Sequence, residues 1–301
     1  MAGFRLQCMA PVTPSFSLTK WVPEDGFAPS ADQGNGKRVL VMSWYNAANF
    51  GDRLGYHVLN GLLPAEAEVT YGTFEPWNVP DRDYDLLIIG IGNSLLPANA
   101  CAPELQQLLE KVPLAIGIFG TQYREKYHQP DAALALDAIL AKVTTWWARS
   151  EEDILAFGQG RANVRHLGDW LISAFPMAVP TRESGLTIPA KVMFQEGALD
   201  RMIQHIQSYR AVSSARLHTL LCALTSADHV SYQEQRMVSD PDLVSGKFRS
   251  MLYDIFGQTF EEDVLFRVDR EAVIRYKRKV EANMALLRAE LFQLLGASCP
   301  Q

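Results

Sequence analysis

Cysteine is scarce in this sequence, and its placement excludes two kinds of site. Cys8, Cys101, Cys222 and Cys299 form no Cys-x-x-Cys pair, so the spacing indicates neither a zinc site nor a disulfide framework. Cys222 lies inside an apolar run, and we expect it in the core. Because scattered cysteines are typical of a reducing compartment, we expect a cytoplasmic protein.

Long apolar runs and an excess of positive charge are also missing. No run approaches the length that spans a bilayer, and residues 1–8 lack the charged start and apolar core of a secretion signal. The net charge of −6 argues against nucleic acid as the main partner, because neutralising its phosphates requires a basic face. A small anion needs only a local cluster of cations, so it stays compatible with this charge.

What the sequence does contain is an ordinary globular composition. It is 48% hydrophobic and 21% charged over 301 residues, which is enough chain for two domains. Short apolar runs typical of buried strands lie at 37–42, 68–74, 85–90, 114–119, 144–148 and 163–167. Helical patterns lie between them at 53–62, 103–111, 131–141 and 151–157. This alternation predicts an α/β fold with a parallel sheet covered on both faces.

A proline-punctuated segment at 176–189 marks the expected domain junction. The alternation resumes after it, with strands at 192–194, before Ser214 and at 229–232, and with helices at 198–208 and from about 217. A charged amphipathic helix at about 269–295 has the length of a strut across one or both domains. We therefore predict an N-terminal arm at 1–37, an α/β domain at 38–176 and a smaller α/β domain at 177–262. A helical C-terminal segment at 263–301 is expected to pack across the domains.

The most informative motif is SSARLH at residues 213–218, which places Arg216 and His218 at a strand-to-helix corner. Backbone N–H groups are unpaired at such a corner, and the helix dipole favours anions there. A guanidinium suits a phosphate or a carboxylate, and a histidine titrates near neutrality. In the simpler alternative Ser214 caps the helix, Arg216 is solvated and His218 packs against a neighbour, and the corner alone favours that alternative.

Two further motifs follow strands of the first predicted domain. In NFGDRLG at 49–55, Gly51 allows the backbone to approach a ligand closely, and Asp52 either caps the following helix or accepts a proton from a sugar hydroxyl. In the loop that contains Gly92 and Asn93, a Gly-x-Gly pattern lacks the third glycine of a dinucleotide site, which argues against NAD. A tight turn and a substrate-lining loop are equally compatible with it.

Three other motifs also lie at or just after the ends of predicted strands. Arg149 precedes Ser150 and Asp153, whose spacing resembles a capping box. Gly168 and Asp169 end the last strand of the first domain. Lys247, with Arg249, begins a segment at 247–254 where both are as compatible with solvated helix charges as with ligands.

Taken in order, these motifs resemble the polysaccharide pyruvyl transferase family, in its shorter, exopolysaccharide-type form. The resemblance covers about residues 38–257 and is carried by NFGDRLG at 49–55, IIGIGNSLL at 88–96, ARS at 148–150, GD at 168–169, SSARLH at 213–218 and GKFRSMLYDIFG at 246–257. The chain departs from the family in having Trp170 after Gly-Asp where relatives often have proline, and in its short second domain.

The resemblance implies two facing Rossmann-like domains in a glycosyltransferase-B-like arrangement, the second one reduced. It implies transfer of a pyruvyl group from phosphoenolpyruvate, as donor substrate and without a cofactor, to a sugar or oligosaccharide. A lipid-linked acceptor would add peripheral contact with the inner face of the membrane. Arg149, Arg216, His218 and the Leu217 backbone would contact the donor. The cleft would be lined by Asn49, Gly51 and Asp52, and Gly92, Asn93 and Lys247 are further expected substrate-binding residues.

In this scheme His218 is the candidate general acid and base, and Asp52 is a weaker candidate for deprotonating the sugar. Arg216 neutralises charge on the donor, and the residue set requires no metal. Two other functions stay open: a nucleotide-sugar-dependent glycosyltransferase of the same architecture, and a sugar-binding relative without catalysis.

Overall fold

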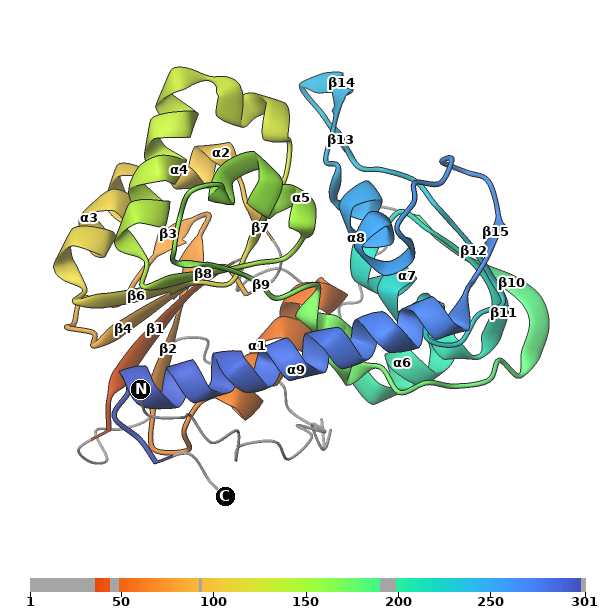
Figure 1. Cartoon of the computed structure of the whole chain (residues 1–301), viewed down its shortest axis with the longest axis horizontal. Helices are drawn as coiled ribbons and strands as arrows, with labels where there is room; N and C mark the ends of the chain where they lie inside the picture. Colours follow the sequence, from red (N-terminus) through yellow and green to blue (C-terminus); the bar gives the residue numbers. More distant parts are fainter. Residues whose placement is uncertain (1–35, 44–48, 92–93, 190–198, 299–301) are drawn as a thin grey trace.

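The computed structural model describes residues 36–43, 49–91, 94–189 and 199–298, and it confirms the α/β class. Two sheets with helices around them lie side by side, and one long helix runs along both (Figure 1). The predicted arm lies mostly outside the described residues, as do Gly92, Asn93 and the strand expected at 192–194.

The larger sheet has seven strands in the order β3-β2-β1-β4-β6-β8-β9. All its pairings are parallel except that of β3 with β2. The strands are β1 (Arg38–Ser43), β2 (Glu68–Phe74), β3 (Trp77–Asn78), β4 (Leu86–Ile89), β6 (Leu114–Gly117), β8 (Thr145–Ala148) and β9 (Val164–His166). The six apolar runs predicted as strands are thereby confirmed, within one or two residues at most ends.

Both faces of this sheet are covered, which explains why its strands are continuously apolar. In β1, Val39 and Val41 point to one core while Leu40 and Met42 point to the other. The helices of this part are α1 (Phe50–Leu62), α2 (Pro97–Ala100), α3 (Pro103–Lys111), α4 (Pro130–Lys142) and α5 (Glu151–Asp153). Shorter turns of helix are η1 (Arg124–His128), η2 (Ile154–Gly158) and η3 (Trp170–Ala174), and β5 (Ser94–Leu95) pairs with β7 (Gly120–Thr121).

The smaller sheet has the order β10-β11-β12-β15, with β15 antiparallel at its edge. Its strands are β10 (Arg182–Ile188), β11 (Tyr209–Ser214), β12 (His229–Tyr232) and β15 (Phe266–Arg267), and its helices are α6 (Leu199–Gln207), α7 (Leu217–Leu224) and α8 (Lys247–Phe256). A hairpin of β13 (Arg236–Met237) and β14 (Asp240–Val244) projects from it.

The sequence analysis placed the domain junction at 176–189 and expected no strand within it, but the structure has one there. This strand is β10, an edge strand whose residues from Arg182 to Gly185 are exposed. An edge strand that faces solvent has no need of an apolar pattern. The sequence therefore offers no signal for it.

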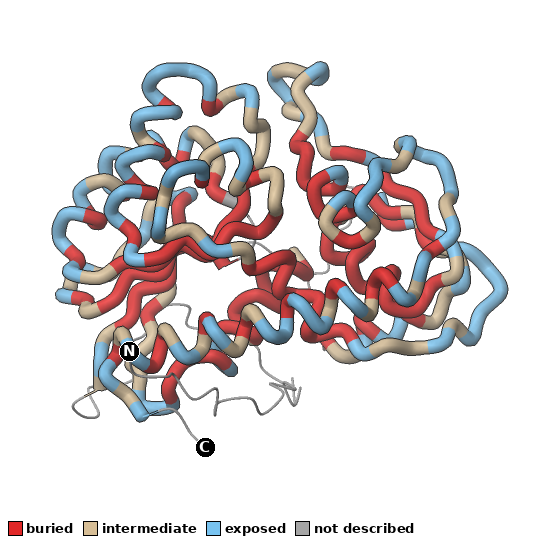
Figure 2. Tube along the Cα trace, viewed as in Figure 1, coloured by how far each residue is buried: buried red, intermediate tan, exposed pale blue. Residues whose placement is uncertain are grey.

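The helix α9 (Arg270–Leu294) lies along both sheets, as the strut prediction anticipated. Its inward face is buried and its outward face is exposed (Figure 2). Near its start, Arg270 donates hydrogen bonds to the carbonyls of Ser226 and Ala178. Near its end, Glu290 accepts a 2.7 Å hydrogen bond from Trp147 Nε1 in β8. None of the described helices meets the length and apolarity needed to cross a membrane.

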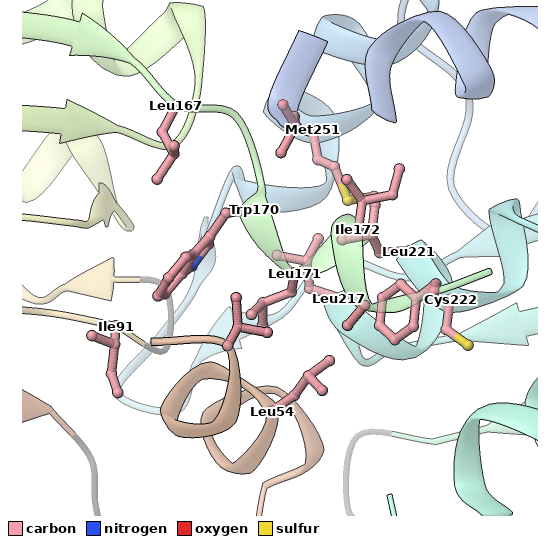
Figure 3. Close-up of a cluster of buried hydrophobic side chains, with 14 of the residues drawn as sticks. Leu54, Ile91, Leu167, Trp170, Leu171, Ile172, Leu217, Leu221, Cys222 and Met251 are labelled. Atoms are coloured by element: carbon pink, nitrogen blue, oxygen red, sulfur yellow. The ribbon is translucent and has the colours of Figure 1, made fainter. Parts of the chain in front are cut away.

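One apolar core extends from the larger sheet into the smaller one. Figure 3 shows its central part, where Leu54 of α1, Leu171 of η3 and Leu221 of α7 meet. Cys222 lies in this cluster with no exposed surface, which confirms its expected place in the core. Because the two sheets share this packing, the ends of their strands are held in fixed positions relative to each other.

Candidate functional site

The predicted residues at the start of α1 lie where β1 has just ended, with residues 44–48 between them. Asn49 is the N-cap of α1, and its Oδ1 accepts a 3.1 Å hydrogen bond from the Gly51 N–H. The helix begins at Phe50, three residues before the predicted start. Asp52 therefore does not cap the helix, as one alternative expected; it lies buried in the first turn, where the helix dipole favours a carboxylate.

Gly51 contacts His218 of the SSARLH motif. A Cβ atom at Gly51 would lie 1.7 Å from His218 Nδ1, so only glycine fits at this position. The backbone of α1 and the ring at the start of α7 are thereby in direct contact. The sequence predicted a close approach at Gly51, and the structure shows that the His218 ring is the group that comes close.

His218 is buried and has a carboxylate on its other side. Its Nε2 lies 3.5 Å from Oδ2 of Asp169, which is 1% exposed. Burial raises the pKa of Asp169, but the neighbouring His218 and Arg149 outweigh this effect and hold that pKa below its ordinary value. The Asp169 N–H donates a 2.6 Å hydrogen bond to Tyr276 Oη of α9. The sequence singled out Asp169 but gave no sign that it pairs with His218.

Arg149 follows β8 and is buried, with 5% of its surface exposed. A Cβ atom at Gly120 would lie 2.8 Å from Arg149 Nε and from Asp153 Oδ2, so the bare glycine backbone makes room for this charged pair. Ser150 caps α5 by accepting a 3.1 Å hydrogen bond from the Asp153 N–H. The Ser150 cap predicted here is confirmed, whereas the Asp153 carboxylate accepts from the Ser150 hydroxyl at 2.7 Å and from Thr121 rather than closing a full capping box.

Arg216 is half-buried and occupies the N-cap position of α7. Ser214 does not cap this helix, contrary to the simpler alternative. Its Oγ accepts the Arg216 N–H at 3.0 Å and donates to the Arg216 carbonyl at 2.9 Å, which fixes the turn before the helix. Burial lowers the pKa of Arg216, while the nearby Asp52 carboxylate raises it. Leu217 packs its side chain into the core, and the expected role of its backbone stays a prediction.

Lys247 is the first residue of α8 and is buried, so it is not a solvated surface charge. Its Nζ donates a 2.6 Å hydrogen bond to Gln235 Oε1. Arg249, two residues on, is half-exposed and lies 3.4 Å from a Glu152 carboxylate oxygen. The two cations that the sequence treated alike therefore have different environments.

Asp52 and Lys247 influence each other within one cluster. Burial raises the pKa of Asp52 to about 7, against the opposing charges of Lys247 and Arg216. Burial lowers the pKa of Lys247 to about 7; Arg149 and Arg216 add to this effect, and Asp52 opposes it. Arg149 from the larger sheet and Arg216 from the smaller sheet thus both act on one ammonium group.

An open cleft of about 450 Å³ adjoins this cluster at Arg216. Tyr123, between β7 and η1, is one of its lining residues, and the others follow β11 and β12 of the smaller sheet: Ala215, Arg216, Gln233, Glu234, Gln235 and Arg236. Gln235 joins the cleft to the cluster, because it accepts from Lys247 and donates from Nε2 to the Ala215 carbonyl at 3.0 Å.

Two residues that the sequence analysis missed hold α8 in place. Arg124 of η1 pairs with Glu152 at 2.9 Å and Asp153 at 3.1 Å, and donates to Ser250 Oγ of α8 at 2.9 Å. Glu234 accepts hydrogen bonds from the first backbone N–H groups of α8, those of residues 248 and 249, at 3.0 Å each. Neither residue lies in a periodic pattern or a motif, and both act across long sequence separations, so no local signal marks them.

Within the ranges that the structure describes, no group of three or more His, Cys, Asp or Glu side chains is placed to hold a metal ion. In comparisons with known proteins, no family model matches the chain. None of the curated proteins matches it either. The resemblance to the pyruvyl transferases therefore depends on the quoted motifs alone.

Proposed function

We propose that this protein transfers a pyruvyl group from phosphoenolpyruvate to two hydroxyls of one sugar, forming a pyruvate ketal. In this proposal the two sheets belong to two facing Rossmann-like units, and the donor binds between them. The observation that supports it best is the gathering of Arg149, Arg216 and Asp52 around one buried ammonium group, that of Lys247. Phosphoenolpyruvate carries a carboxylate and a phosphate, which are the groups that such cations bind.

The charges of the cluster favour an anionic ligand. Burying a cation costs free energy unless an anion pairs with it, and the pKa of Lys247, lowered to about 7, expresses that cost. Asp52 also has a pKa of about 7, so near neutral pH the cluster has less negative charge of its own than an ionised aspartate would give. An incoming dianion between these groups would favour the protonated form of Lys247.

The reaction needs proton transfers at defined atoms. A proton adds to the vinyl CH₂ of the donor to form a methyl group, one sugar hydroxyl attacks C2, and the C2–O bond to phosphate breaks. A second hydroxyl of the same sugar then attacks C2 and closes the ketal. Of the two hydroxyl protons released, one balances the proton taken up by the methyl group and the other leaves with phosphate.

His218 and Asp52 are the proposed proton-transfer groups. His218 is proposed because its ring lies between the Asp169 carboxylate, on the Nε2 side, and the first turn of α1, on the Nδ1 side. Asp52 lies in that same turn. Its pKa of about 7 is suited to both uptake and release of a proton at neutral pH. Asn49, Gly51 and the Leu217 backbone would border the donor, and Gly92 and Asn93, outside the described residues, stay predicted contacts.

Calorimetric titration with phosphoenolpyruvate tests the donor site. We expect Arg216→Ala and Lys247→Met to weaken binding at least tenfold, because each removes a charge-assisted contact. Arg249→Met is the matched control, since Arg249 lies on the same helix but half-exposed and outside the cluster. Equal binding by all four proteins would contradict the proposed donor site.

Phosphate release from phosphoenolpyruvate, measured with and without added glycosides, tests the reaction itself. We expect release to depend on the sugar and to be lost in His218→Ala. A thermal-shift comparison separates the alternative function, because a ligand at 100 times its Kd stabilises the folded protein by about 2.7 kcal/mol. A nucleotide sugar that raises the midpoint while phosphoenolpyruvate does not would replace this proposal with a glycosyltransferase.

A further inference from the structure

The cleft beside Arg216 has features that the donor does not use. We propose that it is a sugar-binding subsite in which the Tyr123 ring stacks on one face of a hexose. The identification of this sugar as the acceptor rests on the proposed function, whereas the binding of a sugar there does not. The cleft volume of about 450 Å³ lies within the range of about 300–1,000 Å³ typical of small-molecule sites.

Tyr123 is held in an unusual backbone conformation at the mouth of this cleft. Its φ of 54° and ψ of 52° are left-handed, and among the described non-glycine residues only Asp263 also has a positive φ. Such strain in a bulky residue persists only where neighbours impose it, and it gathers at ligand sites. Here the Tyr123 N–H donates to the Ser245 carbonyl at 3.3 Å, and the Tyr123 carbonyl accepts from the Lys126 N–H at 2.9 Å.

Tyr123 lines the cleft together with residues that follow β11 and β12 of the smaller sheet. Burial raises the pKa of its phenol, and the Glu234 carboxylate, which also lines the cleft, adds to that effect. Tyr123 is partly exposed and lines the cleft, so in this proposal its ring meets the sugar. A phenol ring that is apolar on its face and polar at its tip suits a sugar, which has a C–H face and a rim of hydroxyls.

The polar groups of the cleft suit a neutral, hydroxyl-rich ligand better than a second anion. Gln233 is exposed on the lining and offers both a donor and an acceptor. Arg236 is already paired with Glu262 at 3.3 Å, and the buried Glu234 adds negative charge. Positive charge is therefore concentrated at the Arg216 end, next to Lys247, where the donor would bind.

The experiment measures saturation-transfer NMR signals for three methyl hexosides, those of glucose, galactose and mannose, with the full-length protein. We expect at least one to bind wild-type protein and to lose at least tenfold in affinity in Tyr123→Gly. Glycine removes the ring and also accepts the left-handed backbone, so this variant keeps the fold. Tyr123→Phe should retain binding within about threefold. Tyr253→Ala, at a half-exposed tyrosine of α8, is the control and should bind as wild type does.

Phosphoenolpyruvate titration of the same variants separates the two proposals. Donor binding should be unchanged in Tyr123→Gly. Sugar binding that is lost in Tyr123→Gly, in a protein that does not bind phosphoenolpyruvate, would leave the subsite standing and refute the pyruvyl transfer. Unchanged sugar signals in Tyr123→Gly, or no signal from any of the three hexosides with wild-type protein, would overturn the subsite.

Discussion

Gly51→Ala is expected to destabilise the protein and to displace His218. The new Cβ would lie 1.7 Å from His218 Nδ1 and 2.4 Å from Cε1, which is far inside van der Waals contact. The ring has little room to move, because it is buried and lies against Asp169. Relief therefore requires either a shift of α1 or the loss of the contact between His218 and Asp169.

The size of the effect follows from these contacts. Overpacking a core costs about 1–3 kcal/mol, and a buried polar group that loses its partner costs about 1–3 kcal/mol more. Alanine returns roughly 0.5–1 kcal/mol through its higher helix propensity. We expect a net loss of about 1–5 kcal/mol in the free energy of unfolding, together with weakened binding of phosphoenolpyruvate.

Urea unfolding of a matched set of variants measures this. Gly61→Ala is the control, since Gly61 lies in the same helix and nothing is within 4 Å of its added Cβ; it should be neutral or stabilising by up to about 1 kcal/mol. In a His218→Ala background, the cost of Gly51→Ala should fall close to zero, because the clashing ring is absent. A cost of similar size in both backgrounds would refute the contact as its cause.

Three further predictions concern the charged groups. Arg124→Ala should lower the free energy of unfolding by about 3 kcal/mol, because it removes the ion pair of the buried Asp153 with Arg124 and leaves Arg149 as the remaining opposite charge. Arg249→Ala should cost under about 1 kcal/mol, and similar urea midpoints for the two variants would contradict this. Phosphoenolpyruvate binding, measured by calorimetry, should tighten as the pH falls from about 8.5 to 7. The reason is that Lys247 gains its positive charge and Asp52 loses its negative charge around pKa values of about 7. Asp52→Asn should flatten this pH dependence, and an equally steep profile in that variant would count against Asp52. The pKa of Asp153 is held low by Arg124 and Arg149 against the raising effect of burial, so its contribution to stability is present at neutral pH and is lost as the pH falls through that lowered pKa; acid titrations of Asp153→Asn should lack this part of the loss.

The sequence predicts best those elements that have a signal in their own residues. The strand β2 lies at the predicted residues 68–74, and α3 at the predicted 103–111, because apolar period and proline punctuation are local signals. The polar edge strand β10 and the hairpin of β13 and β14 have no such signal. Their pairing is decided by neighbours elsewhere in the chain.

For the candidate site, the sequence identified the residues but not their contacts. It named Asp169 and His218 as separate motifs, and the contact between them spans 49 positions in the chain, a separation that no local spacing reveals. It left Lys247 undecided between solvent and ligand, because burial of that ammonium depends on Gln235 and on the position of α8. Tertiary packing settles such questions.

The helix α9 has a consequence for the order in which the molecule matures. Its residues follow both sheets along the chain, yet Arg270 holds carbonyls beside the smaller sheet and Glu290 holds Trp147 in the larger one. During synthesis, which adds about 5–20 residues per second, the two sheets leave the ribosome before the segment that fastens them together. These contacts therefore form last, and α9 closes over two sheets whose residues have all been made before it.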